Sequence, residues 1–140
     1  MRGKAVTVRT DGASRGNPGP AGVGVVIEVE GESRPAEHFA YIGEATNNVA
    51  EYRALLLALS EAEKLSPSSL TILSDSELLV RQLIGRYRVK SDLLKPLYEE
   101  VCRRLRGFPG ARILHVGRGE NREADRLANR AIDDHFQKKV

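Results

Sequence analysis

Hydrophobic and polar positions in the first 45 residues follow the short periods of β-strands. Segment 4–10 reads as one strand, 23–29 is a short apolar run, and 34–42 alternates in part. Glycine and glutamate at 30–32 indicate a hairpin turn. Segment 11–20 holds three glycines and two prolines, which favour an irregular loop. Three strands, joined by a loop and a hairpin, are therefore predicted to come first.

After residue 45 the spacing of apolar residues changes to that of helices. The stripe over 48–65 predicts a first helix, for which Thr46 or Asn47 is a suitable N-cap. Two further strands and three further helices are predicted, in the order 69–74 (strand), 76–84 and 92–105 (helices), 111–116 (strand) and 121–136 (helix). Since the leading strands must pair as hairpins, we predict an α/β fold with a mixed five-stranded sheet flanked by helices, in the order β-β-β-α-β-α-α-β-α.

The composition fits one globular domain over residues 1–140, with 137–140 as a frayed tail. Hydrophobic residues make up 41% and charged residues 29%, which is ordinary for such a domain. No apolar run approaches the roughly 20 residues that span a bilayer, and 1–4 lead directly into a strand, without a signal peptide. The single Cys102 cannot form an internal disulfide. We therefore expect a cytoplasmic protein with no membrane association, in which oxygen atoms are the ligands for any metal.

Charge is distributed unevenly along the chain. The net charge is +3, yet residues 1–80 hold 7 basic against 11 acidic residues, while 81–106 hold 8 against 3. A basic segment beside an acidic one suits a polyanion held next to a cation site. A solvated helix face rich in lysine and arginine is the alternative explanation.

Four acidic residues lie where the predicted strands end and helices begin: Asp11, Glu51, Asp75 and Asp125. Each also has an ordinary structural explanation: Asp11 as a turn residue and Glu51 as an exposed helix residue. Asp75 could cap a helix, and Asp125 is favoured by the helix dipole. Their joint placement is less ordinary, because the ends of neighbouring strands and the starts of covering helices meet at one edge of a sheet. Carboxylates this close repel unless a hard cation such as Mg²⁺ or Mn²⁺ lies between them. Two such ions can assist hydrolysis of a phosphodiester.

The sequence around these acids resembles that of type 1 ribonuclease H. Four blocks carry the resemblance, in the order found in that family: 10–22 (TDGASRGNPGPAG), 46–51 (TNNVAE), 74–76 (SDS) and 121–129 (NREADRLAN). The resemblance covers essentially the whole chain. It implies a ribonuclease H-like fold and an endonuclease that cuts the RNA strand of RNA–DNA hybrids, leaving 5′-phosphate and 3′-hydroxyl ends.

The resemblance also implies roles for individual residues. Asp11, Glu51, Asp75 and Asp125 would be catalytic and would hold two Mg²⁺ or Mn²⁺ ions once substrate is bound. Residues expected to contact the nucleic acid, mainly in the minor groove of the hybrid, are Gly12, Ser14, Asn17, Thr46, Asn47, Asn48 and Glu77. The partner would be the hybrid itself, and we expect a monomer. The 2′-hydroxyl is the group that distinguishes RNA from DNA.

The chain departs from the best-known members in two places. Those members often carry a histidine in a loop before the last catalytic aspartate, whereas this loop offers Arg118, with His115 as the alternative. An arginine cannot act as a general base near neutral pH. Many bacterial members also have an extra basic helix rich in tryptophan. This chain has no tryptophan, and a compact basic segment stands there instead, for which we predict contacts with the DNA backbone through Arg86, Arg88 and Lys90.

Two other functions remain open at this level. The same fold can serve a strand-transfer, resolvase or exonuclease activity, because a fold does not fix a function. A hybrid-binding module with a weak or spent active site is the non-enzymatic alternative. The opening motif argues against another activity of the same fold, and the presence of all four carboxylates argues against a binding module.

Overall fold

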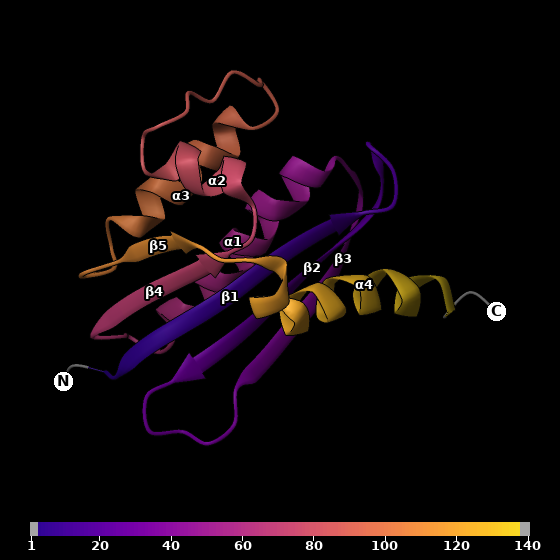
Figure 1. The fold of residues 1–140 in the computed structure, drawn as a ribbon. Coiled ribbons are helices and arrows are strands. Elements are labelled where there is room, and N and C mark those ends of the chain that lie inside the picture. The colour runs from indigo at the N-terminus through magenta and orange to yellow at the C-terminus, as the bar shows by residue number, and fades with distance from the viewer. Residues whose placement is uncertain (1–2, 138–140) are drawn as a thin grey trace.

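Five strands form one mixed sheet, with helices on both of its faces (Figure 1). The structure is a computed structural model that describes residues 3–137. The strands are β1 (Ala5–Ser14), β2 (Gly19–Val29), β3 (Ala36–Ala45), β4 (Ser69–Ser74) and β5 (Arg112–His115), in the sheet order β3-β2-β1-β4-β5. The helices are α1 (Asn47–Glu63), α2 (Glu77–Leu83), α3 (Lys95–Leu105), the 3₁₀ turn η1 (Arg118–Glu120) and α4 (Arg122–Gln137).

The direction of the strands follows from their connections. β1 pairs with β2 and β2 with β3 in antiparallel register, while β4 runs parallel to both β1 and β5. Hairpin connections produce the antiparallel half, and helical crossovers produce the parallel half. The predicted fold class and element order are therefore confirmed.

Helices cover both faces of the sheet, so its central strands are apolar on both sides. In β2, Val25 and Ile27 belong to the main core, which packs beneath α1, whereas Val26 packs against Leu127 of α4 on the opposite face. Figure 1 shows α4 alone on its side of the sheet, and α1, α2 and α3 on the other. Within residues 3–137, no helix is long and apolar enough to span a membrane.

Only residues 15–18 of the segment 11–20 form the loop that its glycines and prolines suggest. β1 continues through Ser14 and β2 begins at Gly19, with Gly12 opposite Val23. Close approach of helices explains Gly12 here and Gly24 further along β2, whereas Gly16 and Gly19 approach each other's backbone in the connection. A Cβ on Gly12 would lie 2.2 Å from the carbonyl carbon of Ala50 in α1, and one on Gly24 would lie 2.2 Å from a backbone oxygen of α4. The prediction is therefore confirmed for 15–18 and wrong for 11–14 and 19–20, since Gly12 serves packing against α1 rather than a turn.

Most other boundaries agree with the prediction to within a few residues. Strand 69–74 is found as predicted, while the third helix begins at Lys95 rather than 92, with Pro96 in its first turn. The turn η1 was not predicted. Of the tail predicted to fray, residue 137 ends α4 and 138–140 lie outside the described residues.

Candidate active site

Three of the four predicted carboxylates meet at one level of the sheet. Asp11 lies within β1, and Asp75 directly follows the parallel neighbour β4, in which Ser74 pairs with Thr10. Glu51 reaches the same point from α1. One carboxylate oxygen from each of the three lies within 4.8 Å of the others. Asp11 and Glu51 are buried and Asp75 is half-buried, so the three acids share a poorly solvated space.

Burial and mutual repulsion make this cluster unfavourable when fully ionised. Burial raises the pKa of Asp11 to about 10, and the negative charge of Glu51 adds to that effect. Burial likewise raises the pKa of Glu51, to about 7, against the opposing hydrogen bond from the backbone of Gly12. Desolvation penalises the charged form, and nearby like charges act in the same direction. The cluster therefore favours the binding of positive charge, either protons or cations.

The backbone of β1 fixes the orientation of Glu51. The N–H of Gly12 donates a 2.8 Å hydrogen bond to Oε1 of Glu51 in a buried position. This contact requires α1 to lie directly on β1, and the missing side chain of Gly12 makes that approach possible. The glycine after Asp11 thus has a structural function, in addition to the contact with nucleic acid that the sequence predicts for it.

Asp125 reaches the site from the first turn of α4. The start of that helix is tied to β1, because Nδ2 of the buried Asn121 donates a 2.8 Å hydrogen bond to the carbonyl oxygen of Thr10. The N–H of Asp125 in turn donates to the carbonyl oxygen of Asn121. The start of α4 is therefore held next to the strand residue that precedes Asp11. Asp125 lies outside the group of three acids described above, and its side chain is exposed.

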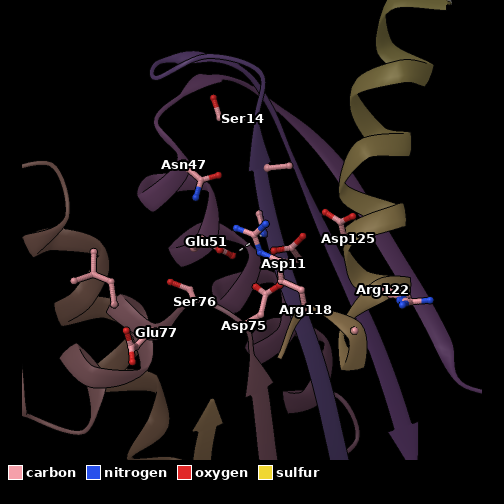
Figure 2. A pocket seen from close by; sticks show the side chains of 14 residues that line it. Asp11, Ser14, Asn47, Glu51, Asp75, Ser76, Glu77, Arg118, Arg122 and Asp125 are labelled. Carbon is pink, nitrogen blue, oxygen red and sulfur yellow. Dashed lines mark hydrogen bonds between the residues drawn. The ribbon is translucent and has the colours of Figure 1, made fainter. Parts of the chain in front are cut away.

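The four acids line one cavity of about 660 Å³ (Figure 2). Its other predicted residues are Gly12, Ser14, Asn47, Glu77 and Arg118. Lining residues that the sequence prediction missed are Ala13, Ser76, Leu78, Gly119 and Arg122. Arg122 precedes Asp125 by three positions and so shares its helix face, a spacing that would have revealed it. Ser76 caps α2, with its side chain accepting a hydrogen bond from the N–H of Leu79, so Asp75 is not the cap of that helix.

Several residues predicted to contact nucleic acid lie beside the cavity rather than in it. Thr46 is the N-cap of α1, and its Oγ1 accepts a hydrogen bond from the N–H of Val49. Oδ1 of Asn17 accepts one from the N–H of Asn47, which ties the β1–β2 connection to the start of α1. Asn48 is exposed in the first turn of α1. These residues therefore build the rim next to the acids.

The predicted basic contacts lie on the segment between α2 and α3. Arg86, Arg88 and Lys90 are exposed, while Val89 between them is buried and anchors the segment to the core. None of the three basic residues lines the cavity. The structure thus places them away from the acids and within reach of solvent.

The structure separates the two candidates for the missing histidine. Arg118 lies in η1 and lines the cavity. His115 ends β5 beside Ser74, is exposed, and is not among the lining residues. The position of Arg118 supports it over His115.

The donor set of the three acids fits a hard divalent cation. Each offers a carboxylate oxygen, and together they carry more negative charge than a buried site retains without compensation. Asp11, Glu51 and Asp75 are therefore the residues that would hold such an ion.

Comparison with known proteins agrees with this geometry. Residues 9–131 match the family model described as Reverse transcriptase-like. The chain is 42% identical over 133 residues to ribonuclease HI of Halobacterium salinarum, an alignment that covers 95% of this chain and 67% of the relative. It is 45% identical over 129 residues to a bifunctional protein of Mycobacterium tuberculosis, covering 91% of this chain and 35% of that protein. The chain thus spans about a third of the length of its mycobacterial relatives.

Solved structures extend the agreement to three dimensions. The crystal structure of the Halobacterium salinarum ribonuclease H1 superposes with a TM-score of 0.89 at 42% identity, covering 93% of this chain and 98% of that one. A ribonuclease H1 crystallised in complex with an RNA/DNA hybrid gives a TM-score of 0.87 at 43% identity, covering 94% and 99%. Family model, sequence identity and shared fold together show that the chain belongs to the ribonuclease H family, in its type 1 (ribonuclease HI) branch.

Proposed function

We propose that the chain is an endonuclease that hydrolyses the RNA strand of RNA–DNA hybrids and leaves 5′-phosphate and 3′-hydroxyl ends. The observation that carries the proposal is the group of Asp11, Glu51 and Asp75, buried at an open cavity with oxygens within 4.8 Å of one another. A purely structural role does not account for such a group, because it destabilises the fold at neutral pH. Membership of the ribonuclease H family supplies the reaction class.

The proposed function of the carboxylates is to hold two divalent cations, Mg²⁺ or Mn²⁺, once the hybrid is bound. Held by these carboxylates, such ions would supply activation of a water molecule and stabilisation of the leaving oxygen. Asp11, Glu51 and Asp75 form the ligand group, and Asp125 completes it from α4. The Gly12 N–H keeps Glu51 in its orientation before the ions arrive, which reduces the reorganisation needed on binding.

Arg118 is proposed to assist at the reacting phosphate as a permanent positive charge. It lines the cavity, and none of the ion pairs formed by residues 3–137 involves it. A free guanidinium can bind phosphate oxygens through paired N–H groups. Its contribution is electrostatic or lies in product release, because it does not give up its proton near neutral pH.

Selection of a hybrid is proposed to come from the rim. Polar groups of Ser14, Asn47 and Glu77 line the cavity beside the acids, where they can approach ribose hydroxyls and base edges. Asn17, Thr46 and Asn48 extend this rim at the start of α1. The exposed Arg86, Arg88 and Lys90 are proposed to contact phosphates of the DNA strand.

The proposed mechanism calls on no residue of a second chain, so we propose that the protein acts as a monomer. A hybrid forms where nucleic acids are copied, so the proposed substrate also supports the expected cytoplasmic location.

A substrate panel tests the proposal. Labelled RNA–DNA hybrid, double-stranded RNA and DNA duplex of one sequence are incubated with Mg²⁺, Mn²⁺ or EDTA, and the product ends are mapped. We expect cleavage of the RNA strand of the hybrid with either ion and no cleavage in EDTA. The products should carry 5′-phosphate ends. Hybrid binding without cleavage under both ions would instead identify a binding module, and cleavage of DNA duplex would identify another nuclease of this fold.

A further inference from the structure

Asn129 contacts Asp125, the acid that α4 contributes to the site. Asp125 is exposed on α4 and lies outside the group of three acids, although its side chain reaches Asp11 of that group. Asn129 lies one helical turn later, on the same face. Its Nδ2 donates to the carbonyl oxygen of Asp125 at 3.0 Å and to Oδ1 of Asp125 at 3.3 Å. The amide therefore joins the backbone and the carboxylate of the same residue.

A second charged residue orients that amide from the opposite side. Nη2 of Arg15 donates to Oδ1 of Asn129 at 3.4 Å and to its carbonyl oxygen at 3.3 Å. If the amide were turned over, its oxygen would face the carboxylate of Asp125 and its NH₂ group would face the guanidinium. Both contacts would then be repulsive, so the two charged neighbours specify one orientation of Asn129.

Arg15 is itself held on α4. Its Nη1 forms a 2.8 Å ion pair with Oδ1 of Asp133, one turn beyond Asn129. Arg15 lies in the connection between β1 and β2, next to Ser14 of the cavity. A continuous series of polar contacts thus runs from this rim, through Arg15 and Asn129, to Asp125.

We propose that Asn129 is a positioning residue, which fixes the carboxylate of Asp125 for cation binding, and that Arg15 orients Asn129 for this purpose. The inference rests on the proposed function and adds residues that the four sequence motifs do not assign to the reaction. A site that must be arranged within fractions of an ångström depends on the groups behind its ligands. The β1–β2 connection thereby acts on the active site as well as on the substrate.

Asn129→Leu is the main test variant, since it keeps the approximate size and a good helix former but removes all three side-chain hydrogen bonds of Asn129. Arg15→Gln removes the guanidinium and leaves Asn129 in place, while Asn129→Gln retains an amide. Arg130→Gln is the matched control, because it changes the adjacent exposed residue, whose ion pair with Asp134 lies outside this series of contacts.

Four quantities are measured for each variant: kcat and KM on the hybrid, the affinity for Mn²⁺ by calorimetry without nucleic acid, the affinity for the hybrid in EDTA, and the midpoint of thermal unfolding in EDTA. For Asn129→Leu we expect kcat and Mn²⁺ affinity each to fall roughly tenfold. KM, hybrid affinity and the unfolding midpoint should remain those of the parent chain. Arg15→Gln should lower kcat and Mn²⁺ affinity by a smaller factor than Asn129→Leu does. Asn129→Gln should recover part of both quantities, and Arg130→Gln should leave both unchanged.

Parental kcat and Mn²⁺ affinity in Asn129→Leu would overturn the inference. A raised KM with unchanged kcat would also overturn it, since Asn129 would then be a substrate contact. If Asn129→Leu unfolds more easily, Arg15→Gln decides, because parental kcat in that variant would show that orientation of the amide is irrelevant. If the parent chain itself fails to cleave hybrid, the proposed function fails, and the Mn²⁺ affinities still test the positioning role independently.

Discussion

The backbone N–H of Gly12 donates a 2.8 Å hydrogen bond to the buried Oε1 of Glu51, and this bond joins the strand that carries Asp11 to the helix that carries Glu51. The bond exists because α1 rests on the bare Cα of Gly12. One glycine thereby sets the separation of two acids of the site. The packing of α1 on β1 and the arrangement of these two acids depend on the same contact.

Gly12→Ala is expected to destabilise the fold by roughly 1–3 kcal/mol. The new Cβ would lie 2.2 Å from the backbone of Ala50, so α1 must move away from β1 and take Glu51 with it. Urea denaturation measures the loss. Gly117→Ala is the control, since a Cβ at Gly117 meets nothing within 4 Å. Equal stability of the two variants would show that the close approach of α1 is unimportant.

The metal-free protein is expected to lose stability as the pH rises from about 4 towards 10. The pKa of Asp11 rises from 3.8 to about 10 on folding and that of Glu51 from 4.5 to about 7, so the folded state binds protons that the unfolded state releases. Stability linked to such groups is fully present below the unfolded pKa and is lost on approach to the folded pKa. Thermal unfolding in EDTA across this range measures the effect.

Asp11→Asn serves as the comparison for that pH series. The variant lacks the carboxyl group whose ionisation destabilises the folded parent chain at high pH. Its unfolding midpoint should therefore exceed that of the parent chain at pH 9, by about 3–5 °C for each kcal/mol of unfolding free energy that the parent chain loses. The two midpoints should converge near pH 4. Mg²⁺ should raise the midpoint of the parent chain at pH 8 more than that of Asp11→Asn, because a ligand stabilises only the state it binds. Parallel pH curves for the two proteins would refute the assigned cause.

Arg118→Ala is expected to lower kcat about tenfold or more while leaving hybrid affinity in EDTA nearly unchanged, since the lost charge acts mainly in the transition state. Arg118→Lys should recover part of the rate. His115→Ala is the matched control and should cleave at the parental rate, because His115 does not line the cavity. Full turnover in Arg118→Ala would exclude the proposed role.

Replacement of Arg86, Arg88 and Lys90 by glutamine is expected to weaken hybrid binding and to reduce its salt dependence. Each lost phosphate contact lowers the slope of log K against log salt by about 0.9. The triple variant should therefore lose up to about 3 units of slope, with kcat at saturating hybrid unchanged. The control replaces Lys4, Arg34 and Lys64, which lie at the opposite end of the sheet from Asp11. An equal change of slope in both triple variants would mean that net charge, not location, is responsible.

Local sequence patterns predicted the elements of this fold and the acids of its site. They placed Asp11 at the end of a strand, whereas β1 continues past it through Gly12 to Ser14. Glycine is a loop signal within a short window, and its use in admitting a helix becomes visible only once the helices are docked. The contact of Arg15 with Asn129, 114 positions away, is beyond any local pattern for the same reason.

The decisive measurement for the proposed nuclease is cleavage of a labelled RNA–DNA hybrid by the parent chain and by Asp11→Asn, with Mg²⁺ and with EDTA. We expect the parent chain to cleave the RNA strand with Mg²⁺ and not with EDTA, and Asp11→Asn to remain folded and bind the hybrid without cleaving it. Cleavage by a folded Asp11→Asn at the parental rate would contradict it, as would an Asp11→Asn chain that no longer folds, since Asp11 would then be a structural residue.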